Sequence, residues 1–359
     1  MRRFIALSVL VLLMTSAFGG VGGVWSRSPA VPLPGVDTAV TRALEQILTA
    51  KPDWLRQAAT AECGAMTEVM RLGRDSIRVV VWSPDGTQLA SAGADGTVRV
   101  WDAVNGTVLD VLEGHTDSVL SVAWSPDGTQ LASASADGTA RVWDAASGAA
   151  LDVLEGQTNT VTSVVWSPDG TRLASAGADG TVRVWDAASG TALHLIKEHT
   201  IWVKTLAWSP DGTRLASASF EGTVRMWDAA NGTALDVLEG HMHRVNSVAW
   251  SPDGTQVASA GMDGTVRVWD AANGTALHVL DEFTSWVNAV AWSPDGTQLA
   301  SAGEDGTVWV WDAASGTALD VLDTDNDWVN AVAWSPDGTQ LASAGAGGAA
   351  QVWGCEGPG

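Results

Sequence analysis

The amino-acid sequence predicts an all-β protein built from repeated four-stranded antiparallel sheets. The segment WSPDGT begins at Trp82 and returns six times at a spacing of 42 residues, with no insertion or deletion. Within each period, three turn signals separate short runs rich in Val, Leu, Ala and Trp. Such a sheet is a propeller blade, because it cannot bury both faces unless neighbouring copies stack on it.

The second copy shows the strands and turns of one period in order. Asp-Gly and Asn-Gly pairs at the turns supply the positive φ angles that tight hairpins require. The expected strands and turns are 119–124 (VLSVAW), SPDG at 125–128, 129–135 (TQLASAS), ADG at 136–138, 139–144 (TARVWD), ASG at 146–148 and 149–155 (AALDVLE). The same order applies to the other copies, so one architecture covers most of the chain.

A second motif, WDA, closes the third strand of six periods, and GH precedes the first strand of two. WDA stands at Trp101, Trp143, Trp185, Trp227, Trp269 and Trp311, and the GH histidines are His115 and His241. The chain therefore resembles the WD-repeat β-propeller family over about residues 63–353. This implies a seven-bladed ring around a central channel, but little about activity, because propellers include scaffolds, lectins and enzymes. The near-identical copies and three lysines are typical of a bacterial protein.

Members of this family close their ring by sharing one blade between the two ends of the chain. Counting 42 residues back from GTVLDVL (106–112) gives GAMTEVM (64–70). We therefore expect a strand at 64–71 to pair with the strand ending at Trp353. This pairing removes an open sheet edge, which would promote aggregation.

The same count places the two cysteines in one reconstructed hairpin turn. Cys355 falls at the position of Ala103, and Cys63 at that of Asn105. Their Cα atoms are expected about 5 to 7 Å apart, near the range that a disulfide accepts. We expect a Cys63–Cys355 disulfide in an oxidising compartment, the alternative being two unreactive thiols.

The first residues have the pattern of a secretory signal. Two arginines follow Met1, an apolar stretch covers 4–14, and small residues follow it. We expect residues 1–20 to be a signal peptide, 21–36 a linker, 37–62 a short helical segment and 63–359 the propeller. An uncleaved membrane anchor is the alternative, and both place the propeller outside the cytoplasm, either secreted or in the periplasm or cell envelope.

The charge excludes one class of partner. The chain has 41 acidic and 19 basic residues and a net charge of −22, so it lacks the clustered cations that nucleic acid requires. No cofactor motif is present. The acidic stretch DTDNDW (323–328) begins like a calcium loop but has no glycine at the sixth position and Trp334 where a glutamate belongs. We expect no metal site.

Two repeats carry a Ser, a His and an Asp in the combination of a hydrolase triad. In the related family these residues, with a Trp, form a hydrogen-bonded tetrad that joins the inner strands of a blade. Repetition also favours a structural role over a single activated nucleophile. The predicted tetrads are His115, Ser133, Asp137 and Trp143, and His241, Ser259, Asp263 and Trp269. We expect the other blades to be incomplete, with Gln157 or Phe283 for the His, or Glu221 for the Asp.

Comparison of the seven copies singles out three positions that vary in chemistry. In copy two the first is Ser118, the second is Leu120, two residues on, and the third is Ala136, just before the tetrad acid. At the first and third positions, small residues stand in copies one to three and mostly larger ones in copies four to seven. In related propellers these positions lie on one face around the channel mouth. Their composition is that of an interaction hot spot, although the tryptophans could instead pack over their own blades. The candidate binding residues are Trp202, Lys204, Phe220, Arg244, Asn246, Met262, Trp286, Asn288, Glu304, Trp328 and Asn330.

These features predict a monomeric, non-catalytic scaffold that binds a protein or peptide outside the cytoplasm. The alternative is a lectin, in which exposed Trp rings stack on sugars and nearby Asn and Glu side chains bind hydroxyls. A propeller enzyme is a third hypothesis, and it requires a convergent acid, base or metal set that is not evident in the sequence.

Overall fold

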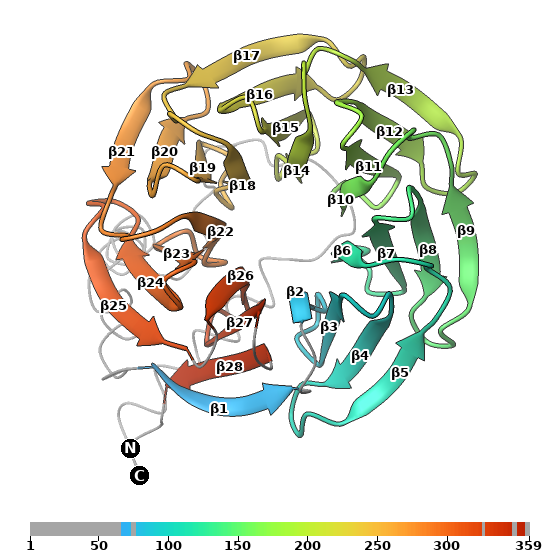
Figure 1. Ribbon diagram of the computed structural model, residues 1–359, viewed down its shortest axis with the longest axis horizontal. Coiled ribbons are helices and arrows are strands. Elements are labelled where there is room, and N and C mark those ends of the chain that lie inside the picture. Colours follow the sequence, from blue (N-terminus) through green and yellow to red (C-terminus); the bar gives the residue numbers. More distant parts are fainter. Residues whose placement is uncertain (1–65, 73–76, 325–326, 347–349, 356–359) are drawn as a thin grey trace, which may run out of the picture. The chain divides into compact units, whose positions relative to one another are not determined.

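The computed structural model describes residues 66–72, 77–324, 327–346 and 350–355. In this part of the chain, seven four-stranded antiparallel sheets stand side by side as the blades of a ring (Figure 1). Consecutive strands pair within each blade, and the first strand of each blade lies innermost. The predicted seven-bladed, all-β propeller is confirmed.

The strand bounds repeat from blade to blade. Blades one to three comprise β2 (Ile77–Trp82), β3 (Gln88–Gly93), β4 (Val98–Asp102), β5 (Val108–Leu112), β6 (Val119–Trp124), β7 (Gln130–Ser135), β8 (Ala140–Asp144), β9 (Ala150–Leu154), β10 (Val161–Trp166), β11 (Arg172–Gly177), β12 (Val182–Asp186) and β13 (Ala192–Ile196). Blades four and five comprise β14 (Val203–Trp208), β15 (Arg214–Ser219), β16 (Thr223–Asp228), β17 (Ala234–Glu239), β18 (Val245–Trp250), β19 (Gln256–Gly261), β20 (Val266–Asp270) and β21 (Ala276–Leu280). Blades six and seven comprise β22 (Val287–Trp292), β23 (Gln298–Gly303), β24 (Thr307–Asp312), β25 (Ala318–Asp323), β26 (Trp328–Trp334), β27 (Gln340–Ala346), β28 (Ala350–Cys355) and β1 (Met66–Leu72).

The SPDG turn between the first two strands of each blade is held by its own side chains. In blade one, Asp85 accepts hydrogen bonds from the Ser83 hydroxyl at 2.6 Å and from the Thr87 amide at 3.0 Å. Gly86 has a φ of +71°, which residues with a Cβ rarely adopt. The turn therefore needs Asp and Gly at adjacent positions, which explains why all seven copies retain them.

Strand β1 completes blade seven, where the sheet order is β1-β28-β27-β26.

On one face of the ring, each SPDG turn packs against the proline of the preceding blade. If Gly86 carried a Cβ, this atom would lie 3.5 Å from Cδ of Pro336 in blade seven. A Cβ on Gly128 of blade two would lie 3.7 Å from Cδ of Pro84 in blade one. The contact between the first and last blades is therefore as close as those between consecutive blades.

The predicted register of β1 is wrong by two residues. Leu72 pairs with Ala350 and is fully buried. In blade one, the equivalent pair is Leu112 and Val98, so Leu72 takes the place of Leu112. Counting 42 residues back had assigned this place to Met70. The count failed because the connection from β1 to β2 is two residues shorter than that from β5 to β6.

This register bears on the predicted disulfide. Met66 is the residue opposite Cys355, and Cys63 precedes it by three residues. Cys63 lies outside the described residues, as do the expected signal peptide, linker and helical segment. The disulfide therefore stays a prediction. In the described ranges, no helix has the length and apolar character needed to cross a bilayer.

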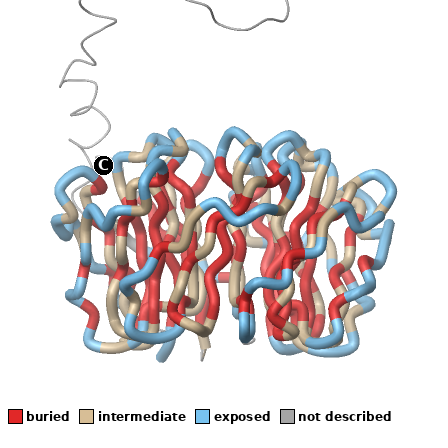
Figure 2. The backbone as a smooth tube through the Cα atoms, turned by 90° about the horizontal axis from the view of Figure 1, so that it is seen from above, coloured by how far each residue is buried: buried red, intermediate tan, exposed pale blue. Residues whose placement is uncertain are grey.

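The hydrophobic core lies between adjacent blades rather than in one central cluster. Between blades seven and one, Leu72, Ile77, Trp82 and Trp101 pack on small residues of β27 and β28, including Ala342. Buried segments run through the height of the ring, and exposed segments lie at the turns on both faces (Figure 2). Because each face consists of turns and loops, residues can differ there between copies without changing the core.

Candidate functional site

The hydrogen bonds of the predicted tetrads are present. In blade two, His115 contacts Asp137 through Nδ1 and Ser133 through Nε2, both at 2.8 Å, and the Trp143 indole donates to Ser133 at 2.8 Å. Blade five repeats this arrangement with His241, Ser259, Asp263 and Trp269. Each tetrad links the loop before the first strand to the second and third strands of its blade.

The expectation that only blades two and five hold a complete tetrad is wrong. In blade four, His199 contacts Glu221 through Nδ1 at 2.8 Å and Ser217 through Nε2 at 2.6 Å. Trp227 donates to the same Ser217 hydroxyl at 2.8 Å. The extra methylene of Glu221 is accommodated, and its other oxygen accepts a hydrogen bond from the Thr200 hydroxyl. A glutamate therefore replaces the aspartate without loss of the bonds.

Burial separates these tetrads from a catalytic triad. Ser133 is completely buried, and the side chain of His115 is 1% exposed. The Ser133 oxygen also accepts the Trp143 N–H bond, so both of its neighbours hold it in place. A hydrolytic serine must reach a substrate carbonyl beside an oxyanion site. Ser133 has no such access, and its role is structural.

The tetrad electrostatics favour a neutral imidazole beside an ionised carboxylate. Burial lowers the pKa of His115, and the hydrogen bond to Asp137 offsets this only in part. Burial raises the pKa of Asp137, but hydrogen bonds from Thr139 and His115 outweigh it and hold that pKa at about 2. In blade four, hydrogen bonds from Thr200 and His199 likewise outweigh burial and lower the pKa of Glu221 to about 2.

A pH dependence of stability follows from Asp137. Its pKa in the folded protein, about 2, is below the ordinary value of 3.8, so its stabilising contribution is complete above pH 3.8 and is lost as pH falls through 2. We expect the wild-type Tm to exceed that of Asp137→Asn at neutral pH, and the gap to narrow as pH falls from 3.8 towards 2. Calorimetry of both proteins at each pH isolates the contribution of Asp137, because the titration of all other groups is common to both. A gap that stays constant down to pH 2 would contradict this assignment.

Blade three contains an incomplete tetrad with an unsatisfied donor. Gln157 replaces the histidine and accepts a hydrogen bond from Ser175 at 3.0 Å, whereas its buried Nε2 has no partner in the described structure. Asp179 is present but bonds to Thr158 and Thr181 instead. We expect Gln157→His to complete this tetrad and stabilise the protein by about 1 kcal/mol. Urea unfolding measures the gain, and an unchanged or lower midpoint would show that the blade does not accept the fourth tetrad.

In blade six, aromatic packing replaces only the hydrogen bonds of the histidine, since Trp311 still donates to Ser301 at 2.7 Å. Phe283 stands in the histidine position, with its ring centroid 6.0 Å from that of Trp309 and 6.3 Å from that of Trp311. The two indoles stack at 5.2 Å. Trp309 occupies a position that is arginine in blades one to five. These two substitutions therefore act together to keep this blade packed.

The first and third variable positions meet at one rim of the ring. In blade four, the Phe220 amide donates to the Trp202 carbonyl at 3.0 Å. Equivalent bonds join Met262 to Arg244 at 2.8 Å and Glu304 to Trp286 at 2.9 Å. In blade seven, Trp328 pairs with Ala346 across the sheet. Backbone pairing thus brings the variable side chains of each blade together in pairs.

Three of the rim tryptophans are substantially exposed. The exposed fractions are 46% for Trp202, 44% for Trp286 and 52% for Trp328. Blades two and three have Ser118 and Thr160 at this position. The large apolar side chains therefore occupy one half of the rim, over blades four to seven, which we call the aromatic half-face.

Trp202 differs from the other two tryptophans in its contacts. Its ring stacks on Phe220 at 5.3 Å, and the Arg244 guanidinium lies 4.5 Å from the Phe220 ring centre. This stack crosses from blade four to blade five. In the described residues no ring contact of Trp286 or Trp328 is found. Ring stacking over its own blade is therefore present for Trp202 and absent, among the described residues, for the other two.

The second variable position lies two residues beyond the first, within the innermost strand of each blade. Its residues are β-bulges on the innermost strands, each interrupting the register with the second strand. The Asn246 amide donates to the carbonyl of Val287 and that of Asn288 to the carbonyl of Val329, both at 3.1 Å. Asn246 and Asn288 thus join neighbouring blades. The bulge residues among the candidates are Lys204, Asn246, Asn288 and Asn330.

Comparison with known proteins adds one decisive finding. The WD40 family model (WD domain, G-beta repeat) matches seven segments that cover most of the chain, at residues 67–102, 106–144, 148–186, 190–228, 232–270, 274–312 and 316–354. The chain belongs to the WD40 family. No curated protein matches it significantly. WD40 propellers are commonly scaffolds for protein interactions, and the family is generally non-catalytic.

Two rim residues of this WD40 propeller were missed by sequence comparison. Ile201 is 44% exposed and Met242 is 83% exposed, and both lie in the loops that carry Trp202 and Arg244. Comparison of the copies could have found them, because the residues of blade two at these positions are polar. Asp117 is equivalent to Ile201, and Thr116 is equivalent to Met242. They extend the apolar character of the aromatic half-face.

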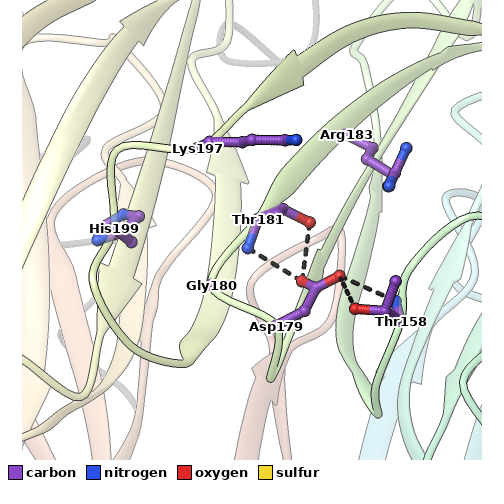
Figure 3. Close-up of a pocket in the computed structure, with 7 residues that line it drawn as sticks. All are labelled: Thr158, Asp179, Gly180, Thr181, Arg183, Lys197 and His199. Atoms are coloured by element: carbon purple, nitrogen blue, oxygen red, sulfur yellow. Dashed lines mark hydrogen bonds between the residues drawn. The ribbon is translucent and has the colours of Figure 1, made fainter.

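A shallow pocket of about 270 Å³ lies where blades three and four meet (Figure 3). Within it, Asp179 accepts hydrogen bonds from Thr158 and Thr181, and Arg183 donates one to the Gly156 carbonyl. No hydrogen bond joins Lys197 or Arg183 to this carboxylate (Figure 3). Among the residues that the structure describes, no three His, Cys, Asp or Glu side chains are placed to hold a metal ion.

Proposed function

We propose that this WD40 protein is a non-catalytic binding module for a protein or peptide, and that it binds through the aromatic half-face. The observation that carries this proposal is the unequal distribution of side chains around one rim. Trp286 and Trp328 are 44% and 52% exposed, while the matching position of blade two is Ser118. Since the same blade framework accepts serine there, exposed tryptophans are not needed to close the ring, and they are typical anchors at interfaces.

The structure weakens the lectin hypothesis, because two of the side chains expected to bind sugar hydroxyls already have partners. Asn246 and Asn288 donate their amide N–H groups to backbone carbonyls of the next blade. A hydroxyl could displace these bonds only by leaving a buried carbonyl unpaired, which costs about 1 to 3 kcal/mol.

We further propose that the propeller acts outside the cytoplasm, as the basic and apolar order of the first residues indicates. A Cys63–Cys355 disulfide would then tie the closing strand to the last blade. Peptide mapping of protein from the cell envelope tests both points, with an N-terminus near Gly20 and a linked cysteine pair as the expected result. Cytoplasmic retention with two free thiols would contradict them.

Affinity capture from an envelope extract tests the binding function, with the folded propeller as bait and a glycan array run in parallel. We expect a protein partner that is retained by the wild-type surface. Binding to glycans in place of protein would favour the lectin.

A further inference from the structure

Glu304 lies beside an exposed indole on the aromatic half-face. The turn that carries Glu304 meets the loop that carries Trp286, because the Glu304 amide donates to the Trp286 carbonyl at 2.9 Å. The Ser285 hydroxyl donates to Oε2 of Glu304 at 3.5 Å, so the carboxylate lies along this loop. Trp286 is 44% exposed, and no ring of the described residues stacks on its indole. A carboxylate and an exposed aromatic surface are therefore neighbours.

The loop that leads into blade seven packs on the turn of blade six that carries Glu304. The amide and the hydroxyl of Thr324, in this loop, both donate to the Gly306 carbonyl, at 3.1 and 2.8 Å. The same loop ends at Trp328, the first residue of β26, which is 52% exposed. This contact brings the first variable position of blade seven, Trp328, towards the third variable position of blade six, Glu304.

Two other blade boundaries show that these positions meet. Between blades one and two, the Ser118 hydroxyl donates to the Ala94 carbonyl at 3.5 Å. Between blades four and five, the Arg244 guanidinium lies 4.5 Å from the Phe220 ring centre. The second contact is also a chemical precedent, because a guanidinium of this rim already stacks on an aromatic ring. At the boundary of blades six and seven, Glu304 stands between two tryptophans and the chain supplies no guanidinium.

The charge around this boundary favours a cationic ligand. Residues 268–359, which include blade six and the three inner strands of blade seven, contain no lysine or arginine. Among the described residues, no cation forms an ion pair with Glu304. The loops that lead to the two tryptophans also carry four exposed carboxylates, those of Asp281, Glu282, Asp323 and Asp327. Since indole faces attract cations, the ring and the carboxylates are complementary to the same kind of group.

We propose that Trp286, Glu304 and Trp328 bind an arginine side chain from a basic segment of the protein partner. This inference rests on the proposed function and specifies the chemistry of the partner. The planar guanidinium stacks on an indole and donates parallel N–H bonds to the Glu304 carboxylate, whereas a lysine ammonium supplies only a point charge. The acidic loops attract the basic segment as it approaches the ring.

Fluorescence polarisation with a labelled tetra-arginine peptide tests the site. Labelled tetra-citrulline, which has a similar shape without the charge, is the matched ligand. We expect wild-type protein to bind tetra-arginine only, with an affinity that falls as salt increases. Glu304→Gln should weaken binding about tenfold or more, because a charge-assisted hydrogen bond is lost. Trp286→Ser should weaken it about fivefold, through loss of the stacked ring. Equal binding of both peptides would overturn the proposal.

Glu155→Gln controls for the overall negative charge of the protein. Glu155 is exposed in the loop before blade three, and this loop leads to Thr160 rather than to a tryptophan. We expect this variant to bind tetra-arginine as the wild type does. A loss equal to that of Glu304→Gln would show that the peptide responds only to net charge, and would overturn the assignment.

Fluorine NMR of protein labelled with fluorotryptophan locates the site. Tetra-arginine should shift the signals of Trp286 and Trp328, which Trp286→Phe and Trp328→Phe assign. The signal of Trp202, which stacks on Phe220, should stay unchanged. A shift confined to Trp202 would overturn the proposal. Unlabelled tetra-lysine should compete less well than unlabelled tetra-arginine, and equal competition would contradict the assignment to arginine.

The outcomes for the partner's chemistry and for the proposed function are separable. If tetra-arginine fails to bind while Trp286→Ser still weakens capture of the native partner, the arginine inference is wrong and the binding face stands. If tetra-arginine binds through Glu304 but the Trp286→Ser protein captures the partner normally, the cation site stands and the aromatic half-face is not the partner surface.

Discussion

Replacing Ser133 by Ala is expected to destabilise the protein by about 3 kcal/mol without affecting its surface. Ser133 is completely buried and bonds at 2.8 Å to both His115 and Trp143. The substitution leaves two polar groups of the blade without a partner, and each costs about 1 to 3 kcal/mol when buried. Urea unfolding monitored by tryptophan fluorescence measures the change.

Ser147→Ala is the matched control. This exposed hydroxyl also makes a short bond, to Asp144 at 2.6 Å, but water can replace it. We expect its effect to stay below about 1 kcal/mol. Equal midpoints for the two variants would show that the tetrad of blade two does not stabilise the fold. A catalytic role for Ser133 would instead appear as lost activity in a protein of normal stability.

Replacing Trp286 by Ser is expected to weaken binding of the captured partner by about 2 kcal/mol, or about thirtyfold, while folding stays intact. Blade two already has Ser118 at this position, and the indole of Trp286 is 44% exposed. Titration calorimetry gives the affinity and thermal unfolding gives the stability. Trp286 is preferred to Trp202 because the latter stacks on Phe220, so its removal would also disturb blade four.

Ser118→Ala, on the opposite half of the same rim, controls for substitution as such and should change the affinity little. The alternative, in which the tryptophan packs its own blade, predicts the reverse pattern. In that case Trp286→Ser would melt earlier while its folded fraction bound the partner normally.

Most of the fold was predictable because the turn chemistry repeats with the strands. Asp85 and Gly86 are required together by the SPDG turn, so each recurrence marks a hairpin at a known offset. The register of β1 was not predictable in this way. Its sequence lacks the motif residues of the other copies, and the two-residue shortening before β2 leaves no mark in a 42-residue count. Burial of Leu72, which only the structure shows, decides the register.

The candidate site was predictable in composition but not in placement. Variation between copies identified Trp286 and Asn288 equally, although one is exposed at the rim and the other bonds to the next blade. A bulge on an innermost strand cannot be distinguished from a rim position by residue type alone. In the tetrads, Glu221 was counted as a defect because it is not the aspartate of the motif, and the hydrogen bonds of the structure correct this.

Hydrogen–deuterium exchange of the propeller, with and without its captured partner, tests the central claim most directly. Binding at the aromatic half-face predicts slower exchange in the rim loops around Trp202, Arg244 and Trp286, and unchanged exchange around Ser118 and Thr160. Protection confined to the outermost strands or to the SPDG turns, with the rim loops unchanged, would contradict the account and place the binding surface elsewhere on the ring.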